Sequence, residues 1–270
     1  MSEWCFFIGP GKTGSTWLYN NLINHPDIKL PKNIKESNYY FQGDSLDDFK
    51  NTFYEYGKVK KINMDISNTY IYNKNIVDKI KKNHPNAKII IGYRDPVERL
   101  KSMYLFKKRN GDIPQDYSLK KSLKNDDFNL ILHSKYYDLS LPYLNEFGMN
   151  NIFIFDFKKI KNEPDNLLKD LMKFLAVSEY LEKDKLYKIT NPASSYRIKF
   201  LSTYSQKISN FLRDKKLYFL LNFIKSNNII QKILFKKINV SEETGLNENY
   251  KIFENKISSD INKFKSIFLK

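Results

Sequence analysis

Hydrophobic and polar residues follow two different periods along this chain, and the two periods alternate. Short apolar runs rich in β-branched or aromatic residues are typical of strands covered on both faces, whereas apolar residues spaced three and four apart indicate amphipathic helices. Strands are predicted in "WCFFI" (4–8), around Ile62–Ile66, in "AKIIIGYRDP" (87–96) and in "NIFIFDF" (151–157). Helices are predicted in "STWLYNNLI" (15–23), "NKNIVDKIKKNHP" (73–85), "DPVERLKSMYLF" (95–106) and "PDNLLKDLMKFLAV" (164–177).

This alternation predicts a P-loop-like α/β fold. Strands separated by helices of this length pair in parallel through right-handed crossovers, so that helices cover both faces of the sheet. We therefore expect a three-layer α/β/α architecture around a central parallel sheet. The chain shows no internal repeat, low-complexity linker or domain boundary, and residues 1–270 are predicted to form a single domain. Ligands of such sheets lie at the carboxyl ends of the strands.

Composition indicates a globular protein of a reducing compartment. With 270 residues, of which 41% are hydrophobic, the chain can bury a large core. The single cysteine, Cys5, lies inside the first predicted strand, so a disulfide framework is excluded and Cys5 is interpreted as a small buried hydrophobe. We see no signal peptide in "MSEWCFFIG" and no apolar run near the roughly 18 residues of a membrane span. We expect a cytoplasmic protein that is at most peripheral at a membrane.

The net charge is strongly positive. Lysine and arginine together number 46, against 30 aspartate and glutamate residues, which gives a formal charge of +16. This balance favours an anionic partner: a nucleic acid, an anionic membrane, an acidic glycan or a polyphosphorylated nucleotide. A biased genome explains the excess equally well. Because the lysines are spread along the chain instead of forming one basic arm, no nucleic-acid partner is expected.

The stretch "FFIGPGKTGSTWLYNNL" (6–22) has the features of a phosphate-binding loop between a strand and a helix. Gly9 and Gly14 have the separation of the triphosphate loop G-x-x-x-x-G-K-[ST], but residue 15 is serine and the only lysine, Lys12, lies in the middle. Free backbone N–H groups at the start of the helix can bind an anion. An ordinary strand-to-helix turn is the alternative interpretation of the two glycines.

A second candidate anion site follows the strand in "AKIIIGYRDP". Asp95 is predicted to cap the next helix, with Pro96 in its first position and Glu98 completing a capping box. Arg94 precedes the cap, and Ser102 lies seven residues beyond it, two helical turns along the same face. Arg94 and Ser102 can hold a second phosphate, or Arg94 can pair with Asp95 or Glu98 instead. The two sites together indicate a nucleotide phosphorylated at both ends.

The two motifs resemble those of the sulfotransferases that use 3′-phosphoadenosine 5′-phosphosulfate (PAPS). "FFIGPGKTGSTWLYNNLINHP" is similar to their 5′-phosphosulfate loop, and "IGYRDPVERLKSMY" to their 3′-phosphate motif, an arginine followed eight residues later by a serine. "KNIKESNYYF" resembles the Lys-Glu-x-x-x-Phe region of the carbohydrate branch, the heparan-sulfate-type enzymes, with one extra residue before its aromatic end. The resemblance is close over residues 4–110, and looser to about 177 and in the segment "NPASSYRIKF", which is expected to form a loop.

The resemblance implies a reaction and a donor site. The expected reaction is in-line transfer of a sulfuryl group from PAPS, as co-substrate and without a metal, to a hydroxyl or amine of a carbohydrate or glycolipid. Such a transfer requires mainly alignment and stabilisation of the leaving phosphate. The residues expected to hold the 5′-phosphosulfate are Gly11, Lys12, Thr13, Gly14, Ser15 and Thr16, with Lys12 beside the bridging oxygen. Arg94 and Ser102 are expected to hold the 3′-phosphate. Arg197 is either a residue that closes over the nucleotide or an exposed surface arginine.

The acceptor must lose a proton, so a base is needed within hydrogen-bond reach. By resemblance, Glu36 occupies the position of this base in the carbohydrate branch, and Lys35 is expected to contact the donor and hold the carboxylate. A solvated Lys35–Glu36 loop pair is the alternative. Asp65 in "NMDISNTY" is the next candidate for the base or for a residue that positions the acceptor.

The chain contains three histidines, the residue type that serves as base in the cytosolic small-molecule branch. His25 and His84 each precede a proline at a predicted helix end and are interpreted as structural. His133 lies outside any recognised motif.

Two other classes of function remain open on the sequence alone. A P-loop nucleotide kinase or other nucleoside triphosphatase needs a magnesium site, for which Asp95 is a candidate, but the positions of Lys12 and Arg94 argue against it. A non-catalytic binder of anionic glycan or nucleic acid needs no pairing of the two phosphate motifs.

Two further segments bear on the acceptor. Residues 101–128 form a basic, aromatic-rich rim that suits sugar hydroxyls or an acidic glycan. Residues 217–238, "LYFLLNFIKSNNIIQKILFKKI", can form a basic amphipathic helix on an anionic membrane, or a helix that packs on the core.

Overall fold

A computed structural model describes residues 3–31, 34–41, 43, 45–54, 60–114, 116–186, 194–196, 235–237 and 248–269. The chain divides into two compact units. The first comprises Met1–Arg94, Lys135–Thr190 and Asp260–Lys270, and the second comprises Asp95–Ser134 and Asn191–Ser259. That the whole chain acts as a single domain stays a prediction.

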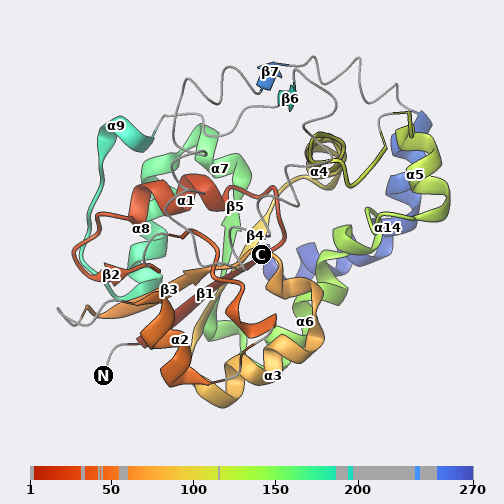
Figure 1. Cartoon of the computed structure of the whole chain (residues 1–270). Coiled ribbons are helices and arrows are strands. Elements are labelled where there is room, and N and C mark those ends of the chain that lie inside the picture. Colours follow the sequence, from red (N-terminus) through yellow and green to blue (C-terminus); the bar gives the residue numbers. More distant parts are fainter. Residues whose placement is uncertain are drawn as a thin grey trace. The chain divides into compact units, whose positions relative to one another are not determined.

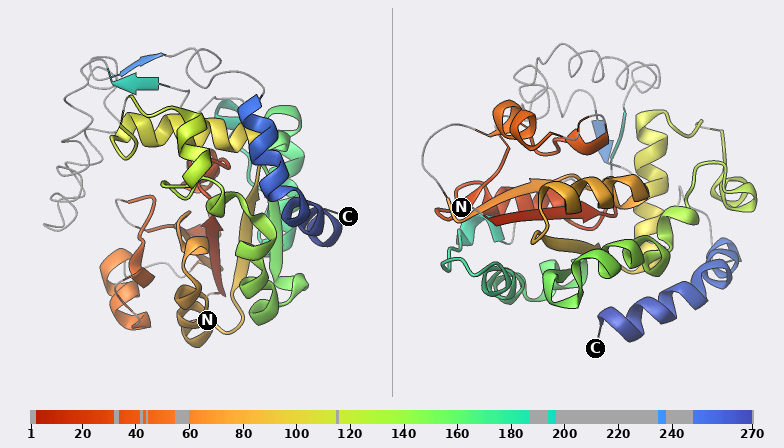
Figure 2. Two further views of the ribbon diagram at one scale, coloured as in Figure 1. Left: turned by 90° about the vertical axis from the view of Figure 1, so that its right-hand side faces the viewer. Right: turned by 90° about the horizontal axis from the view of Figure 1, so that it is seen from below.

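A five-stranded parallel sheet forms the centre of the first unit (Figures 1 and 2). Its strands are β1 (Glu3–Gly9), β2 (Ile28–Lys29), β3 (Ile62–Ile66), β4 (Lys88–Tyr93) and β5 (Ile152–Asp156). Their order is β2-β3-β1-β4-β5, and every neighbouring pair is parallel. The predicted α/β fold is therefore confirmed. The two-residue β2 is the strand that the sequence pattern did not reveal.

The central position of β1 explains its continuous apolar run. Residues 4–9 are all buried, because β3 and β4 flank the strand and helices cover both of its faces. Alternate side chains of β1 therefore enter two separate halves of the core, as the period of a strand requires. Cys5 and Phe7 lie on one face, and Trp4 and Phe6 on the other.

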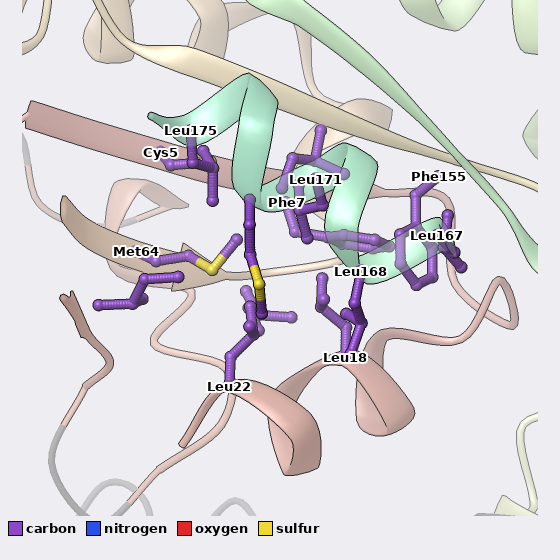
Figure 3. Packing of buried hydrophobic residues seen from close by; sticks show 14 of the residues in the cluster. Cys5, Phe7, Leu18, Leu22, Met64, Phe155, Leu167, Leu168, Leu171 and Leu175 are labelled. Carbon is purple, nitrogen blue, oxygen red and sulfur yellow. The ribbon is translucent and has the colours of Figure 1, made fainter. Parts of the chain in front are cut away.

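Helices of the first unit form the outer layers (Figure 1). They are α1 (Ser15–Leu22), α2 (Leu46–Phe53), α3 (Lys74–Asn83), α6 (Tyr136–Phe147), α7 (Phe157–Asn162), α8 (Pro164–Leu175) and α9 (Lys183–Leu186). On one face, leucines of α1 and α8 pack against Cys5 and Phe7 (Figure 3). On the other face, the ring of Trp4 contacts Phe49 of α2 and His84 at the end of α3, with centroids 5.3 and 4.4 Å away.

The second unit contains α4 (Pro96–Asn110), α5 (Leu119–Asn125), and an antiparallel pair of β6 (Ser194–Tyr196) and β7 (Phe235–Lys237). The helix α14 (Glu248–Phe268) begins in this unit and continues into the first unit at Asp260. The start of α4 is as predicted: Pro96 occupies the first position, and Oδ1 of Asp95 accepts a hydrogen bond from the N–H of Glu98 at 3.0 Å. The side chain of Glu98 pairs with Lys101.

Two expectations for the later part of the chain need correction. Residues 194–196 of "NPASSYRIKF" form strand β6 instead of a loop, because their backbone pairs with residues 235–237. For the same reason the end of the expected helix over 217–238 is a strand. Residues 217–234 and Arg197 lie outside the described residues. Within the described part of the chain, no helix combines the length and apolar character that a membrane span requires.

A buried carboxylate connects the end of β3 to the segment 34–41. Asp65 is fully buried, and its Oδ2 accepts hydrogen bonds from the hydroxyls of Ser37 at 2.8 Å and Ser67 at 3.1 Å. The hydroxyl of Ser67 also accepts the N–H of Asn38 at 3.0 Å. Burial raises the pKa of Asp65 to about 6, although the hydrogen bonds from Ser37, Tyr70 and Ser67 oppose this rise.

The raised pKa predicts a pH dependence of stability for Asp65. Between pH 3.8 and about 6, the folded state holds more of this proton than the unfolded state, so Asp65 lowers the free energy of unfolding as the pH rises through that window. The Asp65→Asn variant lacks this titration. Its stability relative to the wild type should therefore rise between pH 4 and 6, by at most about 3 kcal/mol.

Urea unfolding of both proteins at pH 4, 5, 6 and 7 measures this difference. Asp78→Asn, which changes an exposed carboxylate on α3, is the matched control and should follow the wild type. A constant difference between Asp65→Asn and wild type across this range would contradict the prediction.

Candidate active site

The loop between β1 and α1 has a left-handed backbone at three positions. The φ angles are 110° at Gly9, 74° at Lys12 and 99° at Gly14. Glycine adopts this conformation without steric cost, which explains the two glycines of the motif. A side chain at Gly9 is also excluded by space, because its Cβ would lie 2.1 Å from the backbone oxygen of Asn68. The loop thus lies directly against the turn that follows β3.

Thr13 fixes the loop from inside. It is fully buried, and its hydroxyl donates a hydrogen bond to the backbone oxygen of Pro10 at 2.6 Å. Gly92 of β4 leaves room for it, since a Cβ there would lie 2.0 Å from Oγ1 of Thr13. The hydroxyl of Thr13 is therefore used within the loop itself. The N–H of Gly11 donates to the hydroxyl of Tyr72 at 3.2 Å.

Lys35 and Glu36 lie against this loop. Nζ of Lys35 is 3.1 Å from Oγ of Ser15, 3.4 Å from Oγ1 of Thr16 and 2.5 Å from Oε1 of Glu36. The side chains of Lys35 and Glu36 are 22% and 23% exposed. The pair is therefore not a freely solvated loop pair: Lys35 contacts the first turn of α1 and holds Glu36, and both side chains keep partial access to solvent.

Asn68 completes this cluster. Its Nδ2 donates hydrogen bonds to Oε1 of Glu36 at 2.9 Å and to Oγ of Ser15 at 3.3 Å. Sequence reasoning singled out Asp65 in "NMDISNTY" and missed Asn68, three residues later. A polar residue in the turn after a predicted strand was the only available signal.

Arg94 lies at the end of β4, next to the loop. Its Nη1 donates to the backbone oxygen of Lys12 at 3.3 Å, and its guanidinium lies 4.2 Å from the ring centroid of Phe157. The hydroxyl of Tyr136 contacts the backbone of Arg94 twice, accepting from the N–H at 3.2 Å and donating to the oxygen at 2.9 Å. Arg94, the first residue of the motif after β4, therefore contacts the loop after β1 within the first unit.

The partner predicted for Arg94 belongs to the second unit. Ser102 is partly buried in α4. Its cooperation with Arg94 at one phosphate stays a prediction, and so does the role of Arg197, which is outside the described residues.

Asp65 is not suited to act as the base. It is fully enclosed, and the hydroxyls of Ser37 and Ser67 occupy its carboxylate, so an acceptor cannot reach it. Its described role is to hold the segment that carries Glu36.

The histidines serve the structure or are weak bases. Nδ1 of His25 accepts the N–H of Asp27 at 3.0 Å, and Nε2 of His84 lies 2.6 Å from the hydroxyl of Tyr40. Their structural interpretation is confirmed. His133 belongs to the second unit, and burial, with Lys107 and Arg99 nearby, lowers its pKa to about 4.

Among the residues whose side chains are described, no group of three or more histidine, cysteine, aspartate or glutamate residues is arranged to hold a metal ion. Among the described residues, the charged groups in or beside the loop include the cations Lys12, Lys35 and Arg94 and the carboxylate Glu36. A cationic loop with one carboxylate can bind a multiply charged anion and accept a proton beside it.

Comparison with known proteins places this chain in a family. The sulfotransferase domain matches residues 4–217. The membrane-associated sulfotransferase kil1 of Dictyostelium discoideum is 32% identical over 120 residues, which are 41% of this chain and 25% of that protein, so the match spans about a quarter of that relative's length. The crystal structure of a sulfotransferase from Alicyclobacillus acidocaldarius shares the fold, with a TM-score of 0.59 and 21% identity over 71% of this chain and 87% of that chain. The protein described here belongs to the sulfotransferase domain family.

Proposed function

We propose that this protein transfers a sulfuryl group from PAPS to a hydroxyl or amine of a carbohydrate or glycolipid. The observation that carries the proposal is the contact of Lys35 with Ser15 and Thr16, together with the ion pair between Lys35 and Glu36, which puts a cation at the glycine loop and a candidate base beside that cation. The family supports sulfuryl transfer in general. The donor, the acceptor class and the residue roles are our inference.

The donor site fits a nucleotide that carries phosphate at both ends. We assign the 5′-phosphosulfate to the segment Gly11–Thr16, whose backbone turns through left-handed conformations into the start of α1. We assign the 3′-phosphate to Arg94 and Ser102, with Arg197 as an additional candidate.

Glu36 is the proposed base and Lys12 the proposed partner of the leaving group. The acceptor oxygen forms a bond to sulfur while the bond from sulfur to the bridging oxygen of the 5′-phosphate breaks. The acceptor proton passes to the carboxylate of Glu36, and Lys12 and Lys35 stabilise the charge that grows on the leaving phosphate. The transfer needs no metal in this scheme.

The acceptor proposal rests on the resemblance of the Lys35–Glu36 region to the carbohydrate branch and on the second unit. There, Nζ of Lys121 lies 4.3 Å from the ring centroid of Tyr117, and the guanidinium of Arg109 lies 5.1 Å from that of Phe106. Aromatic faces beside cations suit sugar rings that carry anionic groups.

Our first prediction for this function concerns the nucleotide. Adenosine 3′,5′-bisphosphate (PAP) should raise the melting temperature much more than ATP with Mg²⁺ at the same concentration, because two phosphate sites on adjacent strands match its two ends and a ligand of the native state stabilises it by mass action. Sulfuryl transfer from PAPS should continue in excess EDTA. Equal stabilisation by ATP, or loss of transfer on chelation, would contradict the proposal.

Our second prediction concerns the base. Glu36→Gln should lower turnover by about 10²–10⁴-fold, because the substitution removes the proton acceptor, while the affinity for PAP should hardly change. Lys12→Ala should impair both donor alignment and turnover. Transfer from PAPS and calorimetric binding of PAP measure the two effects separately. Near-normal turnover of Glu36→Gln, with a loss in His133→Ala or Asp65→Asn, would show that the base is assigned wrongly.

Our third prediction concerns location. We propose a cytoplasmic protein with peripheral contact to anionic membranes, supported by the formal charge of +16 and by the description of the Dictyostelium relative as membrane-associated. The protein should float with liposomes that contain anionic lipid at low salt and be released at high salt, because screening weakens such contacts. Liposomes of neutral lipid are the control. No flotation with anionic liposomes at low salt would remove the idea.

A further inference from the structure

The side-chain amide of Asn68 connects the proposed base to the phosphate-type loop. Its Nδ2 carries two hydrogens, and the structure gives each an acceptor: Oε1 of Glu36 at 2.9 Å and Oγ of Ser15 at 3.3 Å. An ionised carboxylate only accepts hydrogen bonds, so the amide nitrogen must face Glu36. The orientation of this amide is therefore dictated by its neighbours.

The backbone of Asn68 is held from both sides. Its carbonyl oxygen packs against Gly9, where a Cβ would lie only 2.1 Å away. The residues on either side of Asn68 form hydrogen bonds with Asn38, which lies in the same segment as Glu36. Oγ of Ser67 accepts the N–H of Asn38, and Oγ1 of Thr69 donates to Oδ1 of Asn38, both at 3.0 Å. Asn68 is thus a fixed point between the loop and the Glu36 segment.

The hydrogen bonds of Ser15 determine where its own proton points. A serine hydroxyl has one hydrogen to donate and two lone pairs to accept with. Lys35 at 3.1 Å and Asn68 at 3.3 Å both donate to Oγ of Ser15 and occupy its lone pairs. The hydroxyl hydrogen of Ser15 is then free to donate, which is the role that an anionic phosphate oxygen requires.

The contacts of Glu36 involve one of its two carboxylate oxygens. Within the described part of the chain, Lys35 and Asn68 both contact Oε1. Oε2 is therefore the oxygen assigned to the acceptor proton.

We propose that Asn68 is a positioning residue with two effects: it orients the carboxylate of Glu36 so that Oε2 faces the acceptor, and it sets the hydroxyl of Ser15 as a donor to the nucleotide. The first effect rests on the proposed role of Glu36 as base. The second depends only on binding of the nucleotide and is tested without turnover.

The test compares Asn68→Ala, Asn68→Asp and Glu36→Gln with the wild type. Turnover is measured as PAP released from PAPS in the presence of an unsulfated heparan-type polysaccharide, which counts transfer to sugar and to water alike. Binding of PAP is measured by calorimetry. Asn83→Ala is the control, because Nδ2 of Asn83 donates to the backbone oxygen of Lys79 within α3. Far-ultraviolet circular dichroism and melting temperature check that each variant folds.

Asn68→Ala should lower kcat by about 10²-fold, the cost of a misplaced catalytic group, and should weaken PAP binding several-fold. In the Glu36→Gln background, Asn68→Ala should lower kcat no further, because its effect on kcat acts through Glu36. A purely structural role would produce the same loss in both backgrounds.

Asn68→Asp keeps the shape of the side chain, so this variant tests the proposal if Asn68→Ala folds poorly. It places a second carboxylate beside Glu36, which disfavours the ionised base, so the acidic limb of the kcat profile should move up by roughly one pH unit. The positioning role of Asn68 would be overturned if the acidic limb of the kcat profile of Asn68→Asp did not move. It would also be overturned if Asn68→Ala lowered kcat equally in the wild-type and Glu36→Gln backgrounds. Unchanged turnover in Glu36→Gln itself would instead overturn the proposed base, and the PAP binding of Asn68→Ala would still decide the effect on Ser15.

Discussion

The site depends on the close approach of two backbones at the carboxyl ends of β1 and β3. These strands pair in parallel, so the loop after β1 and the turn after β3 leave the sheet at the same edge. Gly9 permits the loop to lie against the carbonyl oxygen of Asn68. Because the two turns meet there, the side chain of Asn68 reaches Ser15 on one side and Glu36 on the other. A larger residue at position 9 would separate the loop from the group that we assign as base.

Two carboxylates in this region have different environments, and the difference separates their roles. Asp65 is fully enclosed and is satisfied by hydroxyl groups of its own fold. Glu36 is partly exposed and lies beside a lysine that also touches the loop. An enclosed acid whose oxygens are occupied by hydroxyl groups of the fold cannot meet an acceptor, whereas a partly exposed carboxylate can. Exposure and partners distinguish the two acids, although both are equally plausible in the sequence.

Local patterns revealed most of the sheet and led to the two candidate phosphate motifs, whose roles stay predictions. The runs that became β1, β3 and β4 are almost entirely buried, whereas β5, at the edge of the sheet, is only partly buried. Asp95 and Pro96 begin α4 as their residue types predict. β2 is too short for a period to be visible, and α6 contains Pro142, a residue that usually ends a helix. Asn68 and Tyr136 were not predicted, because their partners lie 53 and 42 positions away in the chain. Such contacts are set by the topology of the sheet and not by any local spacing.

The aromatic rings that pack around the backbone of Arg94 come from distant parts of the chain, so they are synthesised at different times. The ring of Tyr136, whose hydroxyl holds the backbone of Arg94, packs against Tyr93 and against Phe264 of α14, with centroids 5.2 and 5.3 Å away. Phe264 is added about 170 residues after Arg94, which takes roughly 10 to 30 seconds at ordinary rates of translation. During that interval the glycine loop and the strands on either side of it have already been made, while the arginine still lacks its outer aromatic layer. The nascent chain thus has its glycine loop before the aromatic layer that supports the backbone of Arg94 is complete.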